Sequence, residues 1–148
     1  MAKKTKNKHI TLNRKKDLYL KMTPAKGRGV FCRGNIKRGE LLEVTPALLL
    51  NEKQTDAIGD TILMNYVFVA GGISKKLKDK TKIKKTGDAC CVVMGLASYC
   101  NHDAKPNAEV IWEEVEGKLF FSLRATRNIP KNTEICTAYG RGWFKDRE

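Results

Sequence analysis

The clearest structural signal in the chain is the stretch at residues 108–125, which reads AEVIWEEVEGKLFFSLRA. Apolar and polar residues alternate on both sides of Glu116-Gly117, and a period of two is typical of strands with one buried face. A two-residue turn that ends in glycine joins antiparallel strands into a hairpin. The stretch therefore predicts two paired strands, 108–115 and 118–125, and indicates a β-rich fold.

Shorter strand patterns lie on the N-terminal side of this hairpin. Leu18, Leu20 and Met22 fall on every second position, which predicts a half-buried strand. Many short strands with little helix predict a compact, mainly β domain of folded-over hairpins. Further strands are expected at 30–32, at 41–50 with a break at Pro46, at 62–69 and at 90–94, with one or two helical turns at 52–58 and a helical turn or irregular crossing at 95–100.

One short pattern occurs twice. Asn35-Ile36-Lys37-Arg38-Gly39 reappears as Asn128-Ile129-Pro130-Lys131-Asn132, each time between two predicted strands. Five residues are too few for a repeat architecture. We interpret the pattern as a reused turn in which Gly39 or Asn132 adopts a positive φ.

The charge of the chain is concentrated in two segments. The 148 residues contain 29 lysines and arginines against 16 acidic residues, a net charge of +13. Residues 1–16 carry +7 and residues 75–85 carry +6, so the remainder is neutral. We therefore expect a disordered basic tail at 1–16, a folded domain at 17–144 with 75–85 as a protruding, solvated, lysine-rich loop, and a short tail at 145–148.

The composition excludes several classes of protein. No apolar run approaches the roughly 18 residues that a membrane span requires, and the N-terminus lacks a secretory signal, so a soluble protein that is not exported is expected. The five cysteines are odd in number and form no CxxC motif, which argues against a disulfide framework and a zinc site. We expect buried thiols in a reducing, intracellular compartment, with no bound metal, at Cys32, Cys90, Cys91, Cys100 and Cys136.

Three stretches combine uncommon residue types with tight backbone: 27–29 (GRG), 101–107 (NHDAKPN) and 139–144 (YGRGWF). Each signal is weak alone. The GRG stretch lacks the third glycine and the following helix of a dinucleotide-binding fingerprint, so Rossmann-type binding is disfavoured. By default the Asn-His stretch is a polar loop that caps backbone amides, and the late aromatic residues are core or anchor residues.

The order of these and neighbouring stretches is more specific than any one of them. Taken along the chain, five stretches resemble the SET domain of protein-lysine methyltransferases: 26–31 (KGRGVF), 36–40 (IKRGE), 101–108 (NHDAKPNA), 125–129 (ATRNI) and 133–140 (TEICTAYG). The resemblance covers about residues 17 to 144. In its length, and in lacking cysteine-rich flanking modules, the chain is similar to the minimal viral and bacterial members.

The resemblance implies several small β-sheets in which the C-terminal strand threads beneath a preceding loop, a pseudoknot that brings Asn101-His102 beside Tyr139. It also implies S-adenosyl-L-methionine as methyl donor, and a lysine-bearing protein, histone-like or otherwise basic or nucleic-acid-associated, as substrate. Tyr139 matches the catalytic tyrosine of the family, and Tyr99 and Thr137 would line the substrate channel. The residues that the resemblance assigns to the donor are Lys26, Gly27, Arg28, Gly29, Tyr66, Asn101, His102, Trp143 and Phe144.

The chemistry of methyl transfer suits these residue types. The reaction is an in-line displacement, so the enzyme has to hold a methyl group about 3 to 3.5 Å from a lysine nitrogen. Glycines permit close approach of the backbone, and aromatic faces attract cations. Four positions depart from the family pattern: Asp103 replaces serine, and Asn132-Thr133 replace glycine and glutamate. Thr137 replaces an aromatic residue, which bears on the number of methyl groups transferred.

Two other functions fit parts of the sequence. A SET-like binding module would use the two lysine runs to bind nucleic acid or an acidic protein. Because 75–85 contains no aromatic residue to stack on bases, nucleic acid would be bound there only through nonspecific contacts with its phosphates. A thiol hydrolase built on Cys100 and His102 lacks a third orienting group and an oxyanion signature. The presence of Tyr139, Asn101 and Trp143 together favours the methyltransferase, because a scaffold needs none of them together. The resemblance allows a homodimer.

Overall fold

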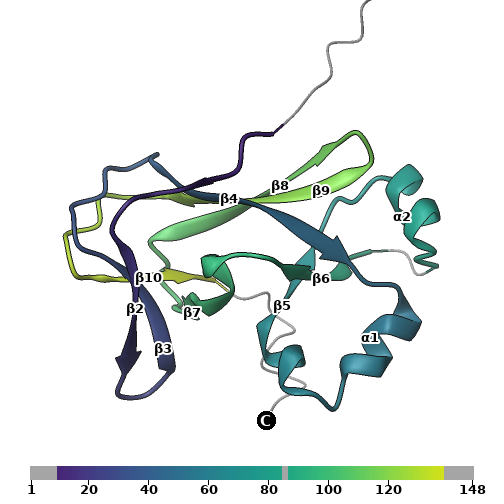
Figure 1. The fold of residues 1–148 in the computed structure, drawn as a ribbon, viewed down its shortest axis with the longest axis horizontal. Helices are drawn as coiled ribbons and strands as arrows, with labels where there is room; N and C mark the ends of the chain where they lie inside the picture. Colours follow the sequence, from purple (N-terminus) through teal and green to yellow (C-terminus); the bar gives the residue numbers. More distant parts are fainter. Residues whose placement is uncertain (1–9, 85–86, 139–148) are drawn as a thin grey trace, which may run out of the picture.

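The computed structural model describes residues 10–84 and 87–138, which form two β-sheets and two short helices (Figure 1). The mainly β class with little helix, predicted from the sequence, is confirmed. The elements in chain order are β1 (Asn13–Arg14), β2 (Leu18–Thr23), β3 (Gly27–Cys32), β4 (Leu41–Leu49), α1 (Glu52–Ile58), η1 (Ile62–Tyr66), β5 (Val67–Ala70), α2 (Lys75–Thr81), β6 (Ala89–Val93), η2 (Leu96–Tyr99), β7 (Asn101–His102), β8 (Ala108–Val115), β9 (Lys118–Ala125) and β10 (Glu134–Thr137), where η denotes a 3-10 helix.

The larger sheet is antiparallel and has the strand order β5-β6-β4-β9-β8, with β1 pairing to β4. The predicted hairpin is confirmed, because β8 and β9 pair along their whole length. At its turn, Glu116 and Gly117 have φ angles of 50° and 73°. Positive φ at both positions is characteristic of a type I′ turn, whose twist matches that of the strands. Phe121 on β9 has no exposed surface and lies in the core of the domain.

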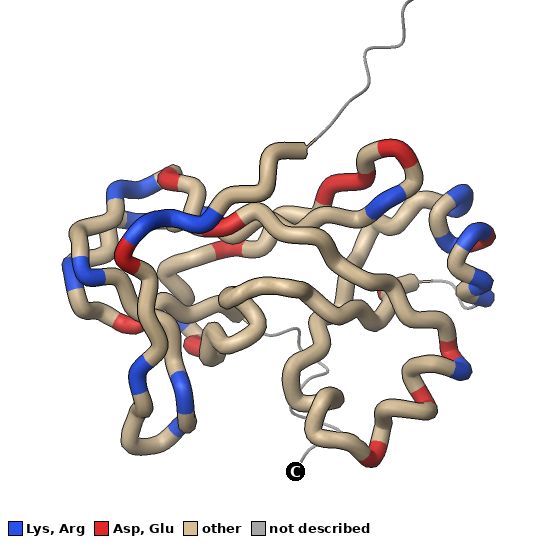
Figure 2. The backbone as a smooth tube through the Cα atoms, viewed as in Figure 1, with Lys and Arg blue, Asp and Glu red and all other residues tan. Residues whose placement is uncertain are grey.

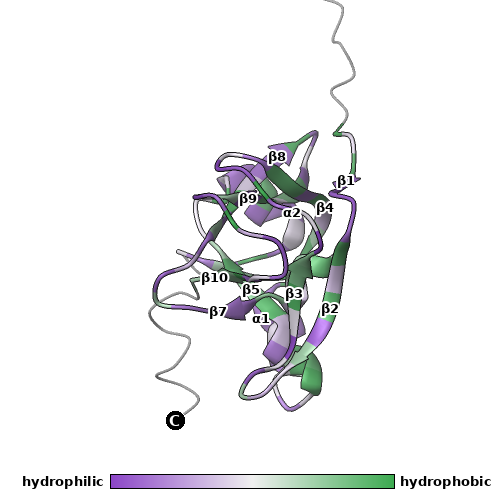
Figure 3. Cartoon of the chain, turned by 90° about the vertical axis from the view of Figure 1, so that its left-hand side faces the viewer, coloured by the Kyte–Doolittle hydropathy of each residue, from purple (hydrophilic) through white to green (hydrophobic). Residues whose placement is uncertain are grey.

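The smaller sheet has the order β2-β3-β10-β7 and is seen from its side of the molecule in Figure 3. β10 pairs antiparallel with β3 and parallel with β7. The last described strand therefore lies between two segments that come from much earlier in the chain. This sheet carries the residues that the sequence singles out for chemistry.

β4 does not break at Pro46, as the sequence predicted, but continues to Leu49. β1 pairs with β4 before Pro46 and β6 pairs with it afterwards, on the edge opposite β9. The carbonyl oxygen of Pro46 accepts a hydrogen bond from the Met94 amide, 3.1 Å away, on the β6 side. Because the nitrogen and carbonyl of one strand residue face the same edge, the missing N–H of proline falls in the gap between β1 and β6.

Two other strand predictions were wrong in part. Residues 62–69 are not one buried strand, because η1 precedes the short β5. In β2 the face predicted to be half-buried is so only at its start: Leu18 packs against the core, whereas 40% of Leu20 and 67% of Met22 are accessible to solvent. β2 is the edge strand of its sheet and lies at the margin of the molecule in Figure 3.

The lysine-rich segment 75–85 is a helix over most of its length, not a protruding loop. α2 begins after Ser74, whose hydroxyl accepts a hydrogen bond from the Leu77 amide at 3.2 Å. Leu77 and Ile83 are buried in the hydrophobic core, which holds the segment against the domain. Most of the lysines are exposed, and they form a basic cluster at the α2 end of the molecule (Figure 2).

The cysteines behave as the sequence predicts. All five are free thiols, and all except the half-buried Cys90 are buried.

Neither of the described helices has the length and apolar composition needed to cross a membrane. Among the residues that the structure describes, no group of three or more His, Cys, Asp or Glu side chains is placed to hold a metal ion.

Candidate functional site

The candidate site lies where β7, β10 and β3 meet. The parallel register places Cys136 opposite Asn101 and Thr137 opposite His102. The Asp103 amide extends this pairing by donating to the Thr137 carbonyl oxygen at 3.0 Å. The asparagine and histidine of the family-like stretch are thereby fixed beside the end of β10.

Asn107 braces the same strand with its side chain. Its Nδ2 donates to the Glu134 carbonyl oxygen, and its Oδ1 accepts from the Cys136 amide, both at 2.8 Å. The side chain thus supplies the donor and acceptor that a neighbouring strand would offer, and only 7% of the residue is exposed. The sequence prediction did not place Asn107 in the site, although the Pro106-Asn107 turn was visible as part of the Asn-His stretch.

The side-chain amide of Asn101 joins three strands. Its Nδ2 donates to the Arg28 carbonyl oxygen on β3 at 3.2 Å, and to Oε2 of Glu134 on β10 at 2.8 Å. Both amide hydrogens are engaged in this way, which leaves Oδ1 as the group that can accept from a ligand. Glu134 was absent from the predicted site, because its role depends on a partner that is distant in sequence.

Gly29 is needed for this contact. A Cβ at residue 29 would lie 2.5 Å from Oε2 of Glu134 and 3.1 Å from Nδ2 of Asn101, closer than side chains tolerate. Gly27 is different, because a Cβ there would meet nothing, but its φ of 71° favours glycine. The GRG stretch therefore owes its two glycines to separate causes: packing at residue 29 and backbone conformation at residue 27.

Cationic and aromatic side chains border the junction. Nζ of Lys26 donates to the His102 carbonyl oxygen at 2.9 Å. The guanidinium of Arg28 lies 4.7 Å from the ring centre of Tyr99, within the range of a cation–π contact. Tyr99 in turn meets the Tyr66 ring edge-on, with centres 5.4 Å apart.

Thr137 is buried at the end of β10. Only 2% of the residue is exposed, and no described group hydrogen-bonds to its Oγ1. Buried hydroxyls are nearly always paired, so this oxygen marks a place where a polar partner is expected.

Most of the predicted site residues are brought together. The gathered residues are Lys26, Gly27, Arg28, Gly29, Tyr66, Tyr99, Asn101, His102 and Thr137. Tyr139, Trp143 and Phe144 lie outside the described residues.

Asp103 takes over a turn-forming role at the position where the family pattern has serine. Its Oδ1 accepts a hydrogen bond from the Lys105 amide at 2.9 Å. This hydrogen bond, assisted by the nearby positive charge of Lys26, lowers the pKa of the Asp103 carboxyl. The departure from the pattern therefore preserves a polar cap in the loop after β7.

The thiols next to the site are not poised as nucleophiles. Burial raises the pKa of Cys100 strongly, and the neighbouring Cys136 and two carboxylates act in the same direction. Burial, assisted by the charge of Glu134, raises the pKa of Cys136 to about 11. A thiol hydrolase needs a lowered thiol pKa, so this environment disfavours that alternative.

Comparison with known proteins agrees with the fold and the motifs. The SET domain family matches residues 27–140, which is most of the chain. A relative from Schizosaccharomyces pombe, described as histone-lysine N-methyltransferase, H3 lysine-37 specific, is 30% identical over 131 residues. The match covers 87% of this chain and 78% of the relative.

Two solved structures have a similar fold. A candidate histone methyltransferase of Plasmodium falciparum superposes with a TM-score of 0.63 at 23% identity, covering 88% of this chain and 98% of that one. The Neurospora SET domain protein DIM-5, a histone lysine methyltransferase, superposes with a TM-score of 0.62 at 20% identity, covering 84% of this chain and 52% of that one. The chain belongs to the SET domain family. Within that family it is a protein-lysine N-methyltransferase.

Proposed function

We propose that the protein transfers a methyl group from S-adenosyl-L-methionine to a lysine of a histone or of another basic, nucleic-acid-associated protein. The observation that carries this proposal is the contact of the Asn101 side chain with Glu134 and with the Arg28 carbonyl oxygen at the junction of β3, β7 and β10. Membership of the SET domain family supports the choice of donor. The histone specificity described for the Schizosaccharomyces pombe relative supports the choice of substrate.

The residues present fit the chemistry of the donor. Its amino-acid end carries an ammonium and a carboxylate, which suit the free Oδ1 of Asn101 and the ammonium of Lys26. Its adenine and sulfonium suit an aromatic face such as that of Tyr66. When bound, the donor supplies an electrophilic methyl group on a positively charged sulfur. The residues proposed to hold it are Lys26, Gly27, Arg28, Gly29, Tyr66, Asn101 and His102, with Trp143 and Phe144 from the part of the chain beyond the description.

The substrate lysine must also lose a proton before it can react. An ammonium has an ordinary pKa near 10.4, and removal from water lowers that pKa, so an apolar channel favours the neutral, nucleophilic amine. Tyr139 is proposed to orient the reacting groups through its hydroxyl. Tyr99 and Thr137 are proposed to line the channel, where the unpaired Oγ1 can hydrogen-bond to the incoming amine or to a water.

The decisive experiment separates donor binding from methyl transfer. Calorimetry with S-adenosyl-L-methionine should give saturable binding, and Asn101→Ala should weaken it by about tenfold or more, because a hydrogen bond to a charged group is lost. Incubation with labelled donor and purified histones should then give a mark on lysine that mass spectrometry can locate. Absence of both donor binding and labelling, with retained affinity for a DNA duplex, would support the binding-module alternative.

A further inference from the structure

We propose that Glu43 is a positioning residue for the donor site, which acts by fixing η2, the turn that carries Tyr99 and leads into β7, where Asn101 lies. The inference rests on the proposed function, which assigns Asn101 to donor binding and Tyr99 to the substrate channel. Glu43 lies on β4 in the larger sheet, whereas the candidate site lies in the smaller one. It was not singled out by any motif in the sequence.

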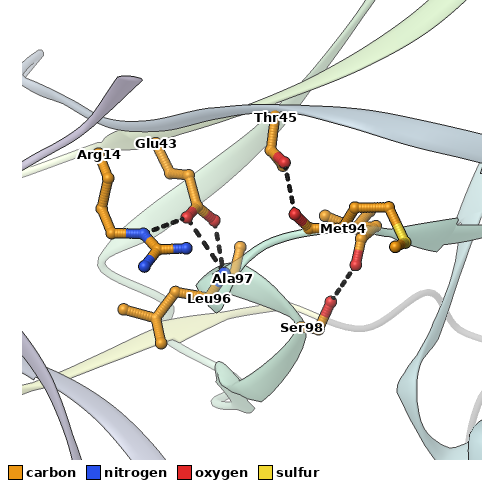
Figure 4. A network of polar contacts seen from close by, with 8 residues as sticks. Arg14, Glu43, Thr45, Met94, Leu96, Ala97 and Ser98 are labelled. Atoms are coloured by element: carbon orange, nitrogen blue, oxygen red, sulfur yellow. Dashed lines mark hydrogen bonds and ion pairs between the residues drawn. The ribbon is translucent and has the colours of Figure 1, made fainter. Parts of the chain in front are cut away.

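The Glu43 carboxylate is buried and fully engaged. Its Oε1 accepts from the Ala97 amide at 2.9 Å, and its Oε2 accepts from the Leu96 amide at 3.1 Å (Figure 4). The same Oε2 accepts from Nε of Arg14 at 2.9 Å. Only 2% of Glu43 is exposed, so the carboxylate is removed from water in order to hold the start of this turn.

Gly95 has no side chain at the point where this contact requires space. A Cβ at residue 95 would lie 2.5 Å from Oε1 of Glu43 and 2.9 Å from Cγ2 of Thr45. The φ of Gly95 is −157°, which is extended backbone that other residues adopt, so conformation does not explain the glycine. Close approach of the carboxylate to the turn explains it.

A short, buried segment of the chain connects the Glu43 contact to the site. The Cys100 amide donates to the Ala97 carbonyl oxygen at 3.0 Å, which closes the turn, and β7 begins at the next residue with Asn101. Ala97 and Cys100 are almost completely buried, so the turn has little freedom to move independently. Tyr99 lies on the same turn and carries the contacts to Arg28 and Tyr66.

Arg14 connects the N-terminal segment to this path. It lies on β1, and its side chain is 57% exposed at the ion pair with Glu43. The arginine supplies the cation that a buried carboxylate needs. The basic N-terminal segment therefore has a structural part in the donor site in addition to its charge.

Three variants test the inference, with donor affinity measured by calorimetry and turnover measured at saturating donor. Glu43→Gln keeps the shape of the side chain but replaces one acceptor oxygen with an amide group that cannot accept. Gly95→Ala displaces the carboxylate without altering it. Both should weaken donor binding by about tenfold, with less than a threefold change in kcat. Arg14→Gln removes the paired cation but leaves the Glu43 carboxylate and its contacts with the turn in place, and it should weaken binding by about threefold.

Thr45→Val and Thr81→Val are the matched controls. Each removes one side-chain hydrogen bond, from Thr45 Oγ1 to the Met94 carbonyl oxygen at 2.7 Å or from Thr81 Oγ1 to the Leu77 carbonyl oxygen at 2.8 Å. Neither bond involves η2 or the Glu43 carboxylate. The controls should lower the melting temperature while leaving donor affinity within twofold of the parent.

A structural readout distinguishes positioning from general destabilisation. Hydrogen exchange at the Leu96 and Ala97 amides should accelerate in Glu43→Gln and not in Thr45→Val. Parent-like donor affinity in both Glu43→Gln and Arg14→Gln, or an equal loss in the controls, would overturn the inference. Absence of donor binding by the parent would instead overturn the proposed function.

Discussion

Asn35 and Asn128 cap each other's turns. Oδ1 of Asn35 accepts from the Lys131 amide at 2.8 Å, and Oδ1 of Asn128 accepts from the Arg38 amide at 2.9 Å. Between them, Ile36 and Ile129 exchange a pair of backbone hydrogen bonds at 2.9 and 2.8 Å. The pattern that occurs twice in the sequence thus forms one paired unit with local two-fold symmetry.

We expect the two caps to contribute equally to stability. Asn35→Ala or Asn128→Ala should each lower the free energy of unfolding by about 0.5 to 1 kcal/mol, because each leaves a backbone amide without its acceptor. Urea unfolding measures this. Lys37→Ala in the same turn is the control and should remain within about 0.5 kcal/mol of the parent. A loss of unfolding free energy in only one of the two asparagine variants would show that the two caps do not contribute equally.

Gly29→Ala should lower both stability and donor affinity, although it adds only one methyl group. The added methyl group must displace Glu134 or Asn101, so we expect a loss of about 1 to 3 kcal/mol in the free energy of unfolding. Donor affinity should fall with it, because the amide of Asn101 loses its anchor. Gly34→Ala is the control, since a Cβ there meets nothing within 4 Å. Equal donor affinity in the two variants would mean that the Asn101–Glu134 contact does not support binding.

Tyr139→Phe should separate catalysis from binding. The change removes one hydroxyl and keeps the ring, so turnover should fall by about a hundredfold, as for the loss of one catalytic hydrogen-bond donor. Melting temperature and donor affinity should remain close to those of the parent. Steady-state kinetics with calorimetry measures both, and full activity in the variant would remove Tyr139 from the catalytic role.

Thr137 should control how many methyl groups are added. Threonine is smaller than the aromatic residue of the family pattern, and the additional space should let a methylated amine rotate for another transfer. We therefore expect di- or trimethyl-lysine under excess donor, measured by mass spectrometry of a peptide product. Thr137→Tyr should shift the product toward fewer methyl groups. Monomethyl-lysine from the parent would show that another group, such as Tyr66 or Tyr99, closes the channel.

Alkaline pH should destabilise the fold through its buried thiols. The folded-state pKa values of Cys91 and Cys136 are raised to about 12 and about 11 from an ordinary value of 9.0, mainly by burial. The unfolded chain therefore releases these protons first, and this contribution to stability is lost as pH rises from about 9 through the folded-state values. Urea unfolding between pH 7 and 10.5 measures the slope. Cys136→Ala should flatten it, and an unchanged slope would assign the effect to other groups.

The sequence predicts local structure well where one segment contains all the information. The β8–β9 hairpin is defined by its own alternation and turn, and the positive φ angles of Gly39 and Asn132 follow from their residue types. Prediction from the sequence failed where the structure of a segment depends on residues that are distant in the chain. The continuity of β4 at Pro46 depends on where two other strands end. The helix at 75–81 depends on core contacts of Leu77, which the seven lysines of 75–85 conceal in the sequence.

The same distinction applies to the site. Asn101, His102 and Thr137 were predicted as site residues because the order of the motifs resembles a known family. Glu43, Asn107 and Glu134 were missed because a lone carboxylate or amide has no signal until its partners are known. Each of the three contacts a segment at least 27 residues away.

The position of β10 in the middle of the smaller sheet also determines when the protein can become active. Its partners, β3 and β7, are synthesised before it, and the pairing of β10 with β3 closes a loop of about a hundred residues, which is slow. Until β10 arrives, both earlier strands present open edges to which other chains can add. The proposed donor site is therefore completed only when β10 has been synthesised and paired. A product that is truncated before Glu134 is a candidate for chaperone capture and degradation, not a partly active enzyme.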